Sequence, residues 1–361
     1  MQISRFFYPK QAFFAAFLFV STFSFSQLRN AEVHKYIEKI QSSYREIIHM
    51  PNLDGYVTLK CDFHTHTVFS DGQVTPMVRV NEAWSDGLDA VAITDHIEYR
   101  PFKDITNPDF NKSNEMAVKH GESIGFIVIK GAEITRKKPI GHLNALFIED
   151  VNKLKQDDPV DAIKEAVKQG AFVMWNHPGW PNDSTTIYDI HRQLIKDKLI
   201  HGVELFNAKE WYPRVLSWGK ETGLTLMGNS DMHHTIRNNY GGEKMARPMT
   251  LVFAKEKSEK GIKEALFDGR MLVLFFNILA GKEDLLKKFV AKCIDVKVID
   301  KKKGVIEAAN NSDIEFTIKY GDNLVILAPD KVTRLTLEQK KEVLFSNCYT
   351  GEEENLVMPL W

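Results

Sequence analysis

The sequence predicts an α/β protein with a largely parallel sheet, followed by a small β-rich C-terminal module. From Tyr56 onward, short apolar segments alternate with longer segments whose apolar residues recur at helical spacing. After about residue 290 short apolar segments continue, but without helical segments between them. The alternating part is compatible with a sheet closed as a barrel or with an open sheet covered by helices on both faces.

The first 26 residues are expected to be a signal peptide. Arg5 and Lys10 precede an apolar run over residues 12–25, and small residues follow at Ser24 and Ser26. The run is shorter than the roughly 20 apolar residues that a membrane-spanning helix needs, so cleavage is favoured over a membrane anchor. We therefore expect an exported protein, periplasmic or secreted, with no stable membrane insertion after cleavage.

Residues 27–55 are predicted to form an N-terminal helix and a linker. Ala31–Ile48 has apolar residues at helical spacing, and Pro51–Gly55 is typical of a turn.

The main domain is predicted over residues 56–285. Its expected strands are Val57–Phe63, Ala90–Thr94, Phe126–Glu133, Leu143–Ile148, Ala171–Asn176, Gly202–Phe206, Thr225–Asn229 and Met249–Phe253. The helices expected between them include Thr75–Ser85, Val160–Gln169, Ile187–Lys198 and Tyr212–Thr222. The C-terminal module, residues 286–361, is expected to contain the strands Val296–Ile299, Ile314–Tyr320, Leu324–Leu327 and Val343–Phe345.

Composition narrows the class of protein. The 361 residues are 43% hydrophobic and 26% charged, which is typical of globular proteins, and the formal net charge is −1. No basic stretch interleaved with aromatic residues stands out, so we expect no binding to long nucleic acid. Three cysteines do not make a disulfide framework. Cys61 is expected to be a buried thiol, whereas pairing of Cys293 with Cys348 remains open.

Imidazole and carboxylate side chains gather at the ends of the predicted strands. His64 and His66 lie two residues apart, so they project from the same face of the first strand. The whole set is His64, His66, Asp71, His96, Glu133, His142, His177, Asp231 and His233. Crowded carboxylates repel one another and resist desolvation unless cations lie among them. Mixed nitrogen and oxygen donors suit zinc, manganese or iron, and strand ends form the active-site rim of parallel barrels. The sequence therefore predicts a site for two or three divalent ions (Mn, Zn or Fe). By contrast, His120, His191 and His201 are expected to be structural.

Six short motifs resemble those of the PHP (polymerase and histidinol phosphatase) metallohydrolase family. They occupy residues 62–66 (Asp-Phe-His-Thr-His), 70–72 (Ser-Asp-Gly), 94–96 (Thr-Asp-His), 131–133 (Gly-Ala-Glu), 176–178 (Asn-His-Pro) and 229–233 (Asn-Ser-Asp-Met-His). The resemblance covers roughly residues 56–275 and implies a distorted (β/α)7 barrel.

The resemblance also implies how the ligands are shared. One ion would be bound by His64, His66, Glu133 and Asp231, a second by Glu133, His142 and His177, and a third by Asp71, His96 and His233. Many relatives have histidine at the position of Asp71, so this carboxylate is expected to alter metal preference or occupancy at the third site.

Residues 60–136 resemble a narrower group, the exported bacterial phosphodiesterases that act on organophosphate diesters. This resemblance implies hydrolysis of small phosphodiesters by a hydroxide that bridges two metal ions. Arg136 and Arg237 are expected to pair with phosphoryl oxygens, and His234 is a candidate proton donor to the leaving oxygen. Trp180, Trp211 and Tyr212 could form an apolar wall for the ester group, although core packing explains them equally well.

Several alternatives stay open. The protein could be a phosphomonoesterase like the histidinol phosphatases, a nuclease acting on short oligonucleotides, or a non-catalytic metal-binding module. The physiological substrate, the native metal and the oligomeric state do not follow from the sequence.

Overall fold

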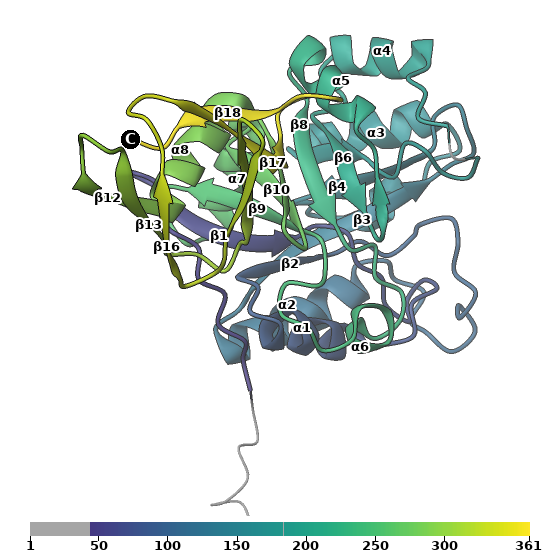
Figure 1. The fold of residues 1–361 in the computed structure, drawn as a ribbon. Coiled ribbons are helices and arrows are strands. Elements are labelled where there is room, and N and C mark those ends of the chain that lie inside the picture. Colours follow the sequence, from purple (N-terminus) through teal and green to yellow (C-terminus); the bar gives the residue numbers. More distant parts are fainter. Residues whose placement is uncertain (1–43, 183) are drawn as a thin grey trace, which may run out of the picture. The chain divides into compact units, whose positions relative to one another are not determined.

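The computed structural model describes residues 44–182 and 184–361, which form an α/β fold around one large mixed sheet (Figure 1). The predicted signal peptide and residues 27–43 lie outside the described residues. Within the described part of the chain, no helix is both long and apolar enough to cross a membrane.

Residues 44–48 fall within the expected N-terminal helix, but they have no helical structure. The backbone N–H of Glu46 donates to Ser85 O at 2.7 Å, and the Arg45 guanidinium donates to Trp84 O and Leu88 O at 2.9 and 2.7 Å. These tertiary contacts hold the segment extended along the turn after helix α1 (Pro76–Ser85) and outweigh its helical apolar pattern.

The main domain contains the eight strands that the sequence predicts, with shifted ends. They are β1 (Val57–Asp62), β2 (Ala90–Ile93), β3 (Ile127–Thr135), β4 (His142–Leu146), β5 (Phe172–Trp175), β6 (Gly202–Asn207), β8 (Thr225–Asn229) and β9 (Met249–Ala254). A two-residue strand β7 (Glu210–Trp211) follows β6 as a tight hairpin.

The sheet is more mixed than the sequence suggests. The pairs β1–β2, β2–β3, β5–β6 and β6–β8 are parallel, but β4 runs antiparallel to both β3 and β5, and β9 runs antiparallel to β1. The connection between β3 and β4 is too short for a crossover, so these strands must be antiparallel. As a result, His142 at the start of β4 pairs with Thr135 at the end of β3.

The expected barrel is not seen as a closed sheet. Strand pairing runs from β15 (Asn323–Leu327) to β7, and no ladder among the described residues joins β8 to β9. At this seam the Thr250 hydroxyl accepts from Gly228 N at 3.0 Å and donates to Gly228 O at 2.9 Å. The two strands are thus linked through a side chain where a closed barrel would have backbone bonds.

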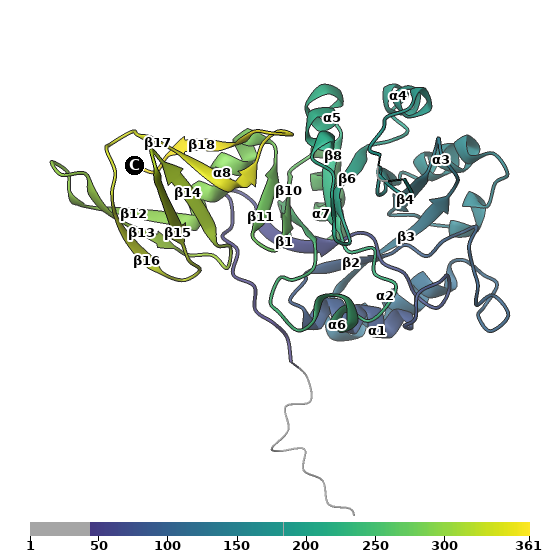
Figure 2. The same cartoon turned by 45° about the vertical axis from the view of Figure 1, so that its right-hand side comes forward.

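Helices cover the main domain on several sides (Figures 1 and 2). They are α1, α2 (Lys112–Ile124), α3 (Pro159–Lys168), α4 (Asp189–Lys196), α5 (Arg214–Thr222), the short α6 (Ile236–Tyr240) and α7 (Glu259–Asp268). Two of them begin at a proline preceded by a capping residue, Thr75 for α1 and Asp158 for α3.

Strand β2 is apolar at every position. Ala90 and Ala92 pack in one apolar cluster, whereas Val91 and Ile93 pack in another on the opposite face. A strand that is buried on both faces needs apolar residues at every position.

The C-terminal part continues the same sheet (Figure 2). After β10 (Met271–Phe275), β11 (Ile278–Gly281) and α8 (Glu283–Cys293), the chain forms β12 (Ile294–Asp300), β13 (Val305–Asn310), β14 (Phe316–Tyr320), β15, β16 (Val332–Thr336), β17 (Glu342–Tyr349) and β18 (Asn355–Pro359). β17 pairs in parallel with β11, while β12, β13 and β16 form a separate three-stranded sheet. The predicted boundary between residues 285 and 286 falls inside α8.

All three cysteines are buried free thiols. The structure therefore answers the open question about Cys293 and Cys348, which are not joined by a disulfide.

Candidate metal centre

The nine candidate ligands converge at one rim of the sheet. His64 and His66 follow β1, His96 follows β2, His177 follows β5, and Asp231 and His233 follow β8. Glu133 lies near the end of β3, and His142 reaches the same rim because β4 runs in the opposite direction. Strand ends rather than chain proximity bring these residues together.

The innermost group surrounds two carboxylate oxygens. His64 Nε2 lies 3.4 Å from Glu133 Oε2 and 3.2 Å from Asp231 Oδ1, and His66 Nε2 lies 3.3 and 3.1 Å from the same two atoms. All four atoms are buried and none has a hydrogen-bond partner among the described residues. Leaving four such atoms unpaired would be costly, so their common orientation fits a shared cation.

Glu133 is the centre of a second group. Its Oε1 lies 2.8 Å from His142 Nδ1 and 3.7 Å from His177 Nε2, and its Oε2 lies 2.9 Å from His96 Nδ1. The His142 Nδ1 atom is also buried without a hydrogen bond. One carboxylate thus faces five imidazole rings, since it also approaches His64 and His66.

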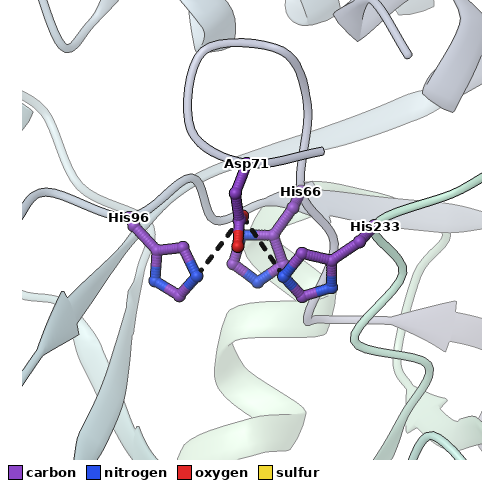
Figure 3. Close-up of side chains that lie close together, drawn as sticks. All are labelled: His66, Asp71, His96 and His233. Atoms are coloured by element: carbon purple, nitrogen blue, oxygen red, sulfur yellow. Dashed lines mark ion pairs between the residues drawn. The ribbon is translucent and has the colours of Figure 1, made fainter. Parts of the chain in front are cut away.

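Asp71 organises the outer group, which Figure 3 shows. Its Oδ1 lies 3.2 Å from His233 Nε2, 3.4 Å from His96 Nε2 and 3.9 Å from His66 Nδ1. The ring of His66 stacks on both His96 and His233, with centroid distances of 4.4 and 4.2 Å. Asp71 Oδ1 is another buried atom without a hydrogen-bond partner.

Four overlapping groups of these residues could hold a metal ion. They are His66–Asp71–His96–His233, His64–Glu133–His177, His64–His66–Asp231 and His96–Glu133–His142. The donors are nitrogen and oxygen atoms, as the sequence suggests for zinc, manganese or iron.

The ionisation of the buried carboxyl groups in the cluster also indicates that positive charge is needed there. Burial opposes ionisation of Glu133, but the imidazoles of His96 and His64 lower the pKa of this carboxyl group well below its ordinary value, and Asp231 behaves likewise beside His64 and His66. Burial disfavours the charged form of His96, but Glu133 and Asp71 raise its pKa to about 10. For His66, burial and the neighbouring His96 and His233 lower the pKa to about 3. Ionised carboxylates at this depth need positive charge, which protonated imidazoles or divalent ions can supply.

Two candidate ligands have a strained backbone. Asp231 has φ of +49° and His177 has φ of +24°, in a region that residues other than glycine rarely adopt. Such strain is concentrated at functional sites, where surrounding contacts enforce it. Here Ser230, just before Asp231, donates its backbone N–H to Asp62 Oδ1 at 3.1 Å, and Asp62 also pairs with the Arg247 guanidinium.

Glu204 is a functional residue that sequence reasoning missed. This fully buried carboxylate lies in β6, and its Oε1 accepts from His64 Nδ1 and Asn229 Nδ2, both at 2.9 Å. Its Oε2 accepts from His177 N at 2.7 Å and from Asn207 Nδ2 at 2.8 Å. Glu204 therefore turns His64 Nε2 toward Glu133 and Asp231. The sequence signal that could have identified Glu204 is a single carboxylate within an otherwise mostly apolar strand.

Asp95 has a similar supporting role for the loop that carries Asp71. Its carboxylate accepts hydrogen bonds from Thr67 N, Thr67 Oγ1 and Ser70 Oγ at 2.7–2.8 Å.

The structure does not bring the three predicted catalytic residues into the centre. Arg136 lines a small neighbouring cavity with His142 and His177, but its guanidinium pairs with Glu98 at 2.9 Å and donates to Gln156 O rather than contacting a candidate ligand. His234 is exposed, and Arg237 lines a different cavity together with Glu82 and Lys244. Adjacency in sequence to the ligand motifs therefore did not place any of the three side chains among the candidate ligands.

A cavity of about 480 Å³ opens over the cluster. Its walls are formed by Asp71, His96, Tyr99, Thr135, His142, His177, Trp180, Asn207, Ala208, Glu210, Asp231 and His233. Of the three aromatic residues expected at an apolar wall, only Trp180 lies here. Trp211 packs on Phe206 and Tyr349, and Tyr212 is buried, as the core-packing alternative has it.

All nine candidate ligands lie within a region of the chain that matches a known protein family. The PHP domain model matches residues 62–307. A crystal structure of a two-domain protein from Bacteroides vulgatus, which contains a predicted PHP-like metal-dependent phosphoesterase, is 38% identical. The match covers 88% of this chain and 99% of that chain, with a TM-score of 0.84. An uncharacterized protein of Methanocaldococcus jannaschii is 38% identical over 81 residues, which is 22% of this chain and only 36% of that relative. The extent of the domain match and of the Bacteroides match together establish the relationship: the chain belongs to the PHP domain family.

Proposed function

We propose that this protein is a metal-dependent phosphodiesterase that cleaves small organophosphate diesters. The observation that carries the proposal is the set of buried, unpaired ligand atoms of His64, His66, Glu133 and Asp231, next to a cavity of about 480 Å³ that Asp231 and five other candidate ligands line. Divalent ions would be held by these residues together with Asp71, His96, His142, His177 and His233. The phosphoesterase in the Bacteroides relative supports the reaction class.

Bound divalent ions would supply a strongly acidified water and would neutralise charge on the phosphoryl group. The protein's own residues have other tasks. Glu204 fixes His64 in one orientation, and Asn207 Nδ2 donates to Asp231 Oδ2 at 3.2 Å, which orients that carboxylate at the cavity floor.

The preference for diesters over monoesters is supported by the cavity walls. Among the described residues that line the cavity, there is no lysine or arginine. A phosphomonoester carries close to two negative charges and gains from additional fixed cations, whereas a diester carries one. The same lack of basic side chains favours small esters over long nucleic acids.

The experiment is a comparison of two chromogenic esters on metal-free protein reconstituted with Mn²⁺ or Zn²⁺. We expect bis(4-nitrophenyl) phosphate to be hydrolysed with a higher kcat/KM than 4-nitrophenyl phosphate, and chelation to remove the activity. Asp231→Asn and His64→Ala should abolish hydrolysis while the circular dichroism spectrum stays native. Full activity of either folded variant would refute the site, and preference for the monoester would favour the phosphomonoesterase alternative. Metal binding without turnover of either ester would favour the non-catalytic module.

We also propose that the protein is exported, on the basis of the first 26 residues. Cleavage after residue 26 in cells, measured by N-terminal sequencing of the fractionated protein, is the direct test.

A further inference from the structure

The cavity is also lined by residues that are not among the candidate metal ligands. Trp180 and Tyr99 line it with 49% and 54% of their surfaces exposed. The Trp180 ring lies 5.0 Å from the His142 ring and 5.6 Å from the His177 ring, and Tyr99 lies 6.0 Å from His96. Two partly exposed aromatic rings thus lie beside the cluster.

Among the described residues that line this cavity, Glu210 is the one acidic residue outside the candidate ligand set. It belongs to the hairpin between β6 and β7, where Asn207 pairs with Glu210. Its Oε2 accepts a hydrogen bond from the buried Tyr212 hydroxyl, and no lysine or arginine among the described residues makes an ion pair with it. The neighbouring Lys209 is directed instead toward the Tyr240 ring, 5.9 Å away.

Trp180 and Glu210 belong to the same side of the cavity. The Tyr212 ring that holds Glu210 packs so closely on Gly179 that a Cβ atom there would lie 2.7 Å from the ring. Gly179 directly precedes Trp180, whose backbone N–H donates to His177 O at 3.0 Å. Tyr212 therefore links the backbone next to Trp180 with the Glu210 carboxylate, and both side chains line the cavity.

An aromatic face beside a carboxylate is suited to an organic cation. A quaternary ammonium group gains from the electron-rich ring face and from the negative charge, and it needs no hydrogen-bond acceptor. From this wall we propose that the alcohol part of the substrate carries an ammonium group, so that the substrate class is a phosphodiester of an amino alcohol such as choline. Trp180 and Glu210 would act as specificity residues. This inference rests on the proposed phosphodiesterase function.

The test uses two esters that differ only in this charge. We would compare 4-nitrophenyl phosphocholine with 3,3-dimethylbutyl 4-nitrophenyl phosphate, its uncharged isostere, on reconstituted protein. We expect the choline ester to be preferred about tenfold in kcat/KM, the size of effect that a cation over an exposed aromatic ring beside a carboxylate can give. Glu210→Gln should remove most of this preference, and Trp180→Ala should lower it by raising KM for the choline ester alone.

Glu221→Gln, on the exposed surface of α5, is the matched control and should keep the wild-type preference. Equal hydrolysis of the two esters by the wild-type protein, or an unchanged preference in Glu210→Gln, would overturn the inference. If neither ester is hydrolysed, the proposed function fails, and calorimetric titration with choline still tests the wall. Binding of choline to the wild-type protein and weaker binding to Glu210→Gln would support it, whereas equal binding or none would overturn it.

Discussion

At the scale of single residues, the candidate metal centre depends on side chains that are not themselves candidate ligands. Glu204 makes four hydrogen bonds, two of which fix the ring of His64 and the backbone of His177. Residues that orient a metal ligand typically change metal affinity when they are replaced. The strained backbone at His177 makes this support more important, because the bond to His177 N helps to hold φ at +24°.

We expect Glu204→Gln to weaken metal binding roughly 10- to 100-fold, because the amide presents a donor where four donors already converge. Calorimetric titration of metal-free protein with Mn²⁺ measures the change. Glu221→Gln is the control and should bind as the wild type does. Unchanged affinity in a folded Glu204→Gln protein would show that His64 is oriented without this carboxylate.

His191 lies outside the centre and gives the protein a dependence on pH. The ring is buried, stacks on Trp175 at 3.8 Å, donates from Nε2 to Ile140 O at 2.8 Å and accepts from Tyr188 N at 3.2 Å. Burial lowers its pKa from 6.5 to about 4. The structural role expected for this histidine is consistent with these contacts.

The unfolded chain binds this proton more readily than the folded one. The neutral form of buried His191 therefore stabilises the folded protein, and this stabilisation is complete above about pH 6.5. This stabilisation is lost as the pH falls toward about 4, by roughly 3 kcal/mol. Urea unfolding of the wild type and of His191→Gln at pH 7.5 and pH 5 measures the effect. The difference in the free energy of unfolding between the two proteins should shrink at pH 5. A difference that stays constant would assign the acid sensitivity to other groups.

At the scale of elements, the loop after β1 shows how a short motif positions a ligand. Thr67 O accepts backbone hydrogen bonds from Ser70 and Gly72, both at 3.0 Å. A Cβ atom at Gly72 would lie 2.7 Å from the backbone carbon and oxygen of His66, so only glycine fits there. The tight return of the chain at Gly72 is what points Asp71 back toward His96 and His233.

We therefore expect Gly72→Ala to displace Asp71 and to lower the number of bound ions, because the outer group loses its carboxylate. Elemental analysis of reconstituted protein gives the stoichiometry. Gly242→Ala is a suitable control, since a Cβ atom there would approach only the Arg237 side chain, at 3.6 Å. Unchanged stoichiometry in Gly72→Ala would mean that the loop adapts without moving Asp71.

Elements also differ in how far the sequence could predict them. The strands of the main domain were placed within a few residues, since most of their residues are apolar and buried. Helix α2 was missed because its buried residues are Ser113, Asn114, Ala117 and Gly121, which give no apolar period. Gly121 packs against Val128, and Asn114 bonds both Gly131 N and O, so this helix is held by close approach and polar contacts.

The candidate ligands were predictable because strand ends bring distant motifs together. The catalytic candidates were chosen because they follow ligand motifs in the sequence, and their positions were not predictable in this way. Arg136 and Arg237 follow ligand motifs directly, but their orientation depends on Glu98 and on the cavity beside α6, which the sequence does not reveal.

At the scale of the whole molecule, four of the C-terminal strands (β14, β15, β17 and β18) belong to the large sheet of the main domain, and the two parts share an apolar core. β17 extends the large sheet by pairing with β11. One apolar cluster contains Phe345 of β17, Phe316 of β14, Leu286 of α8, Leu251 of β9 and Val80 of α1. A core that crosses the predicted boundary in this way should unfold as one unit rather than as two.

Phe345 tests this coupling because it is fully buried in β17, far along the chain from the metal ligands. Truncation of a buried phenylalanine to alanine typically costs about 3–5 kcal/mol. We expect Phe345→Ala to lower the midpoint of a single thermal transition, seen at the same temperature by tryptophan fluorescence and by release of bound metal. Leu324→Ala is the control, since Leu324 in β15 is 64% exposed and its truncation should change the midpoint little. If metal release in Phe345→Ala stayed at the wild-type temperature while other signals shifted, the two parts would unfold separately, and the C-terminal strands would be a module attached to a self-sufficient domain.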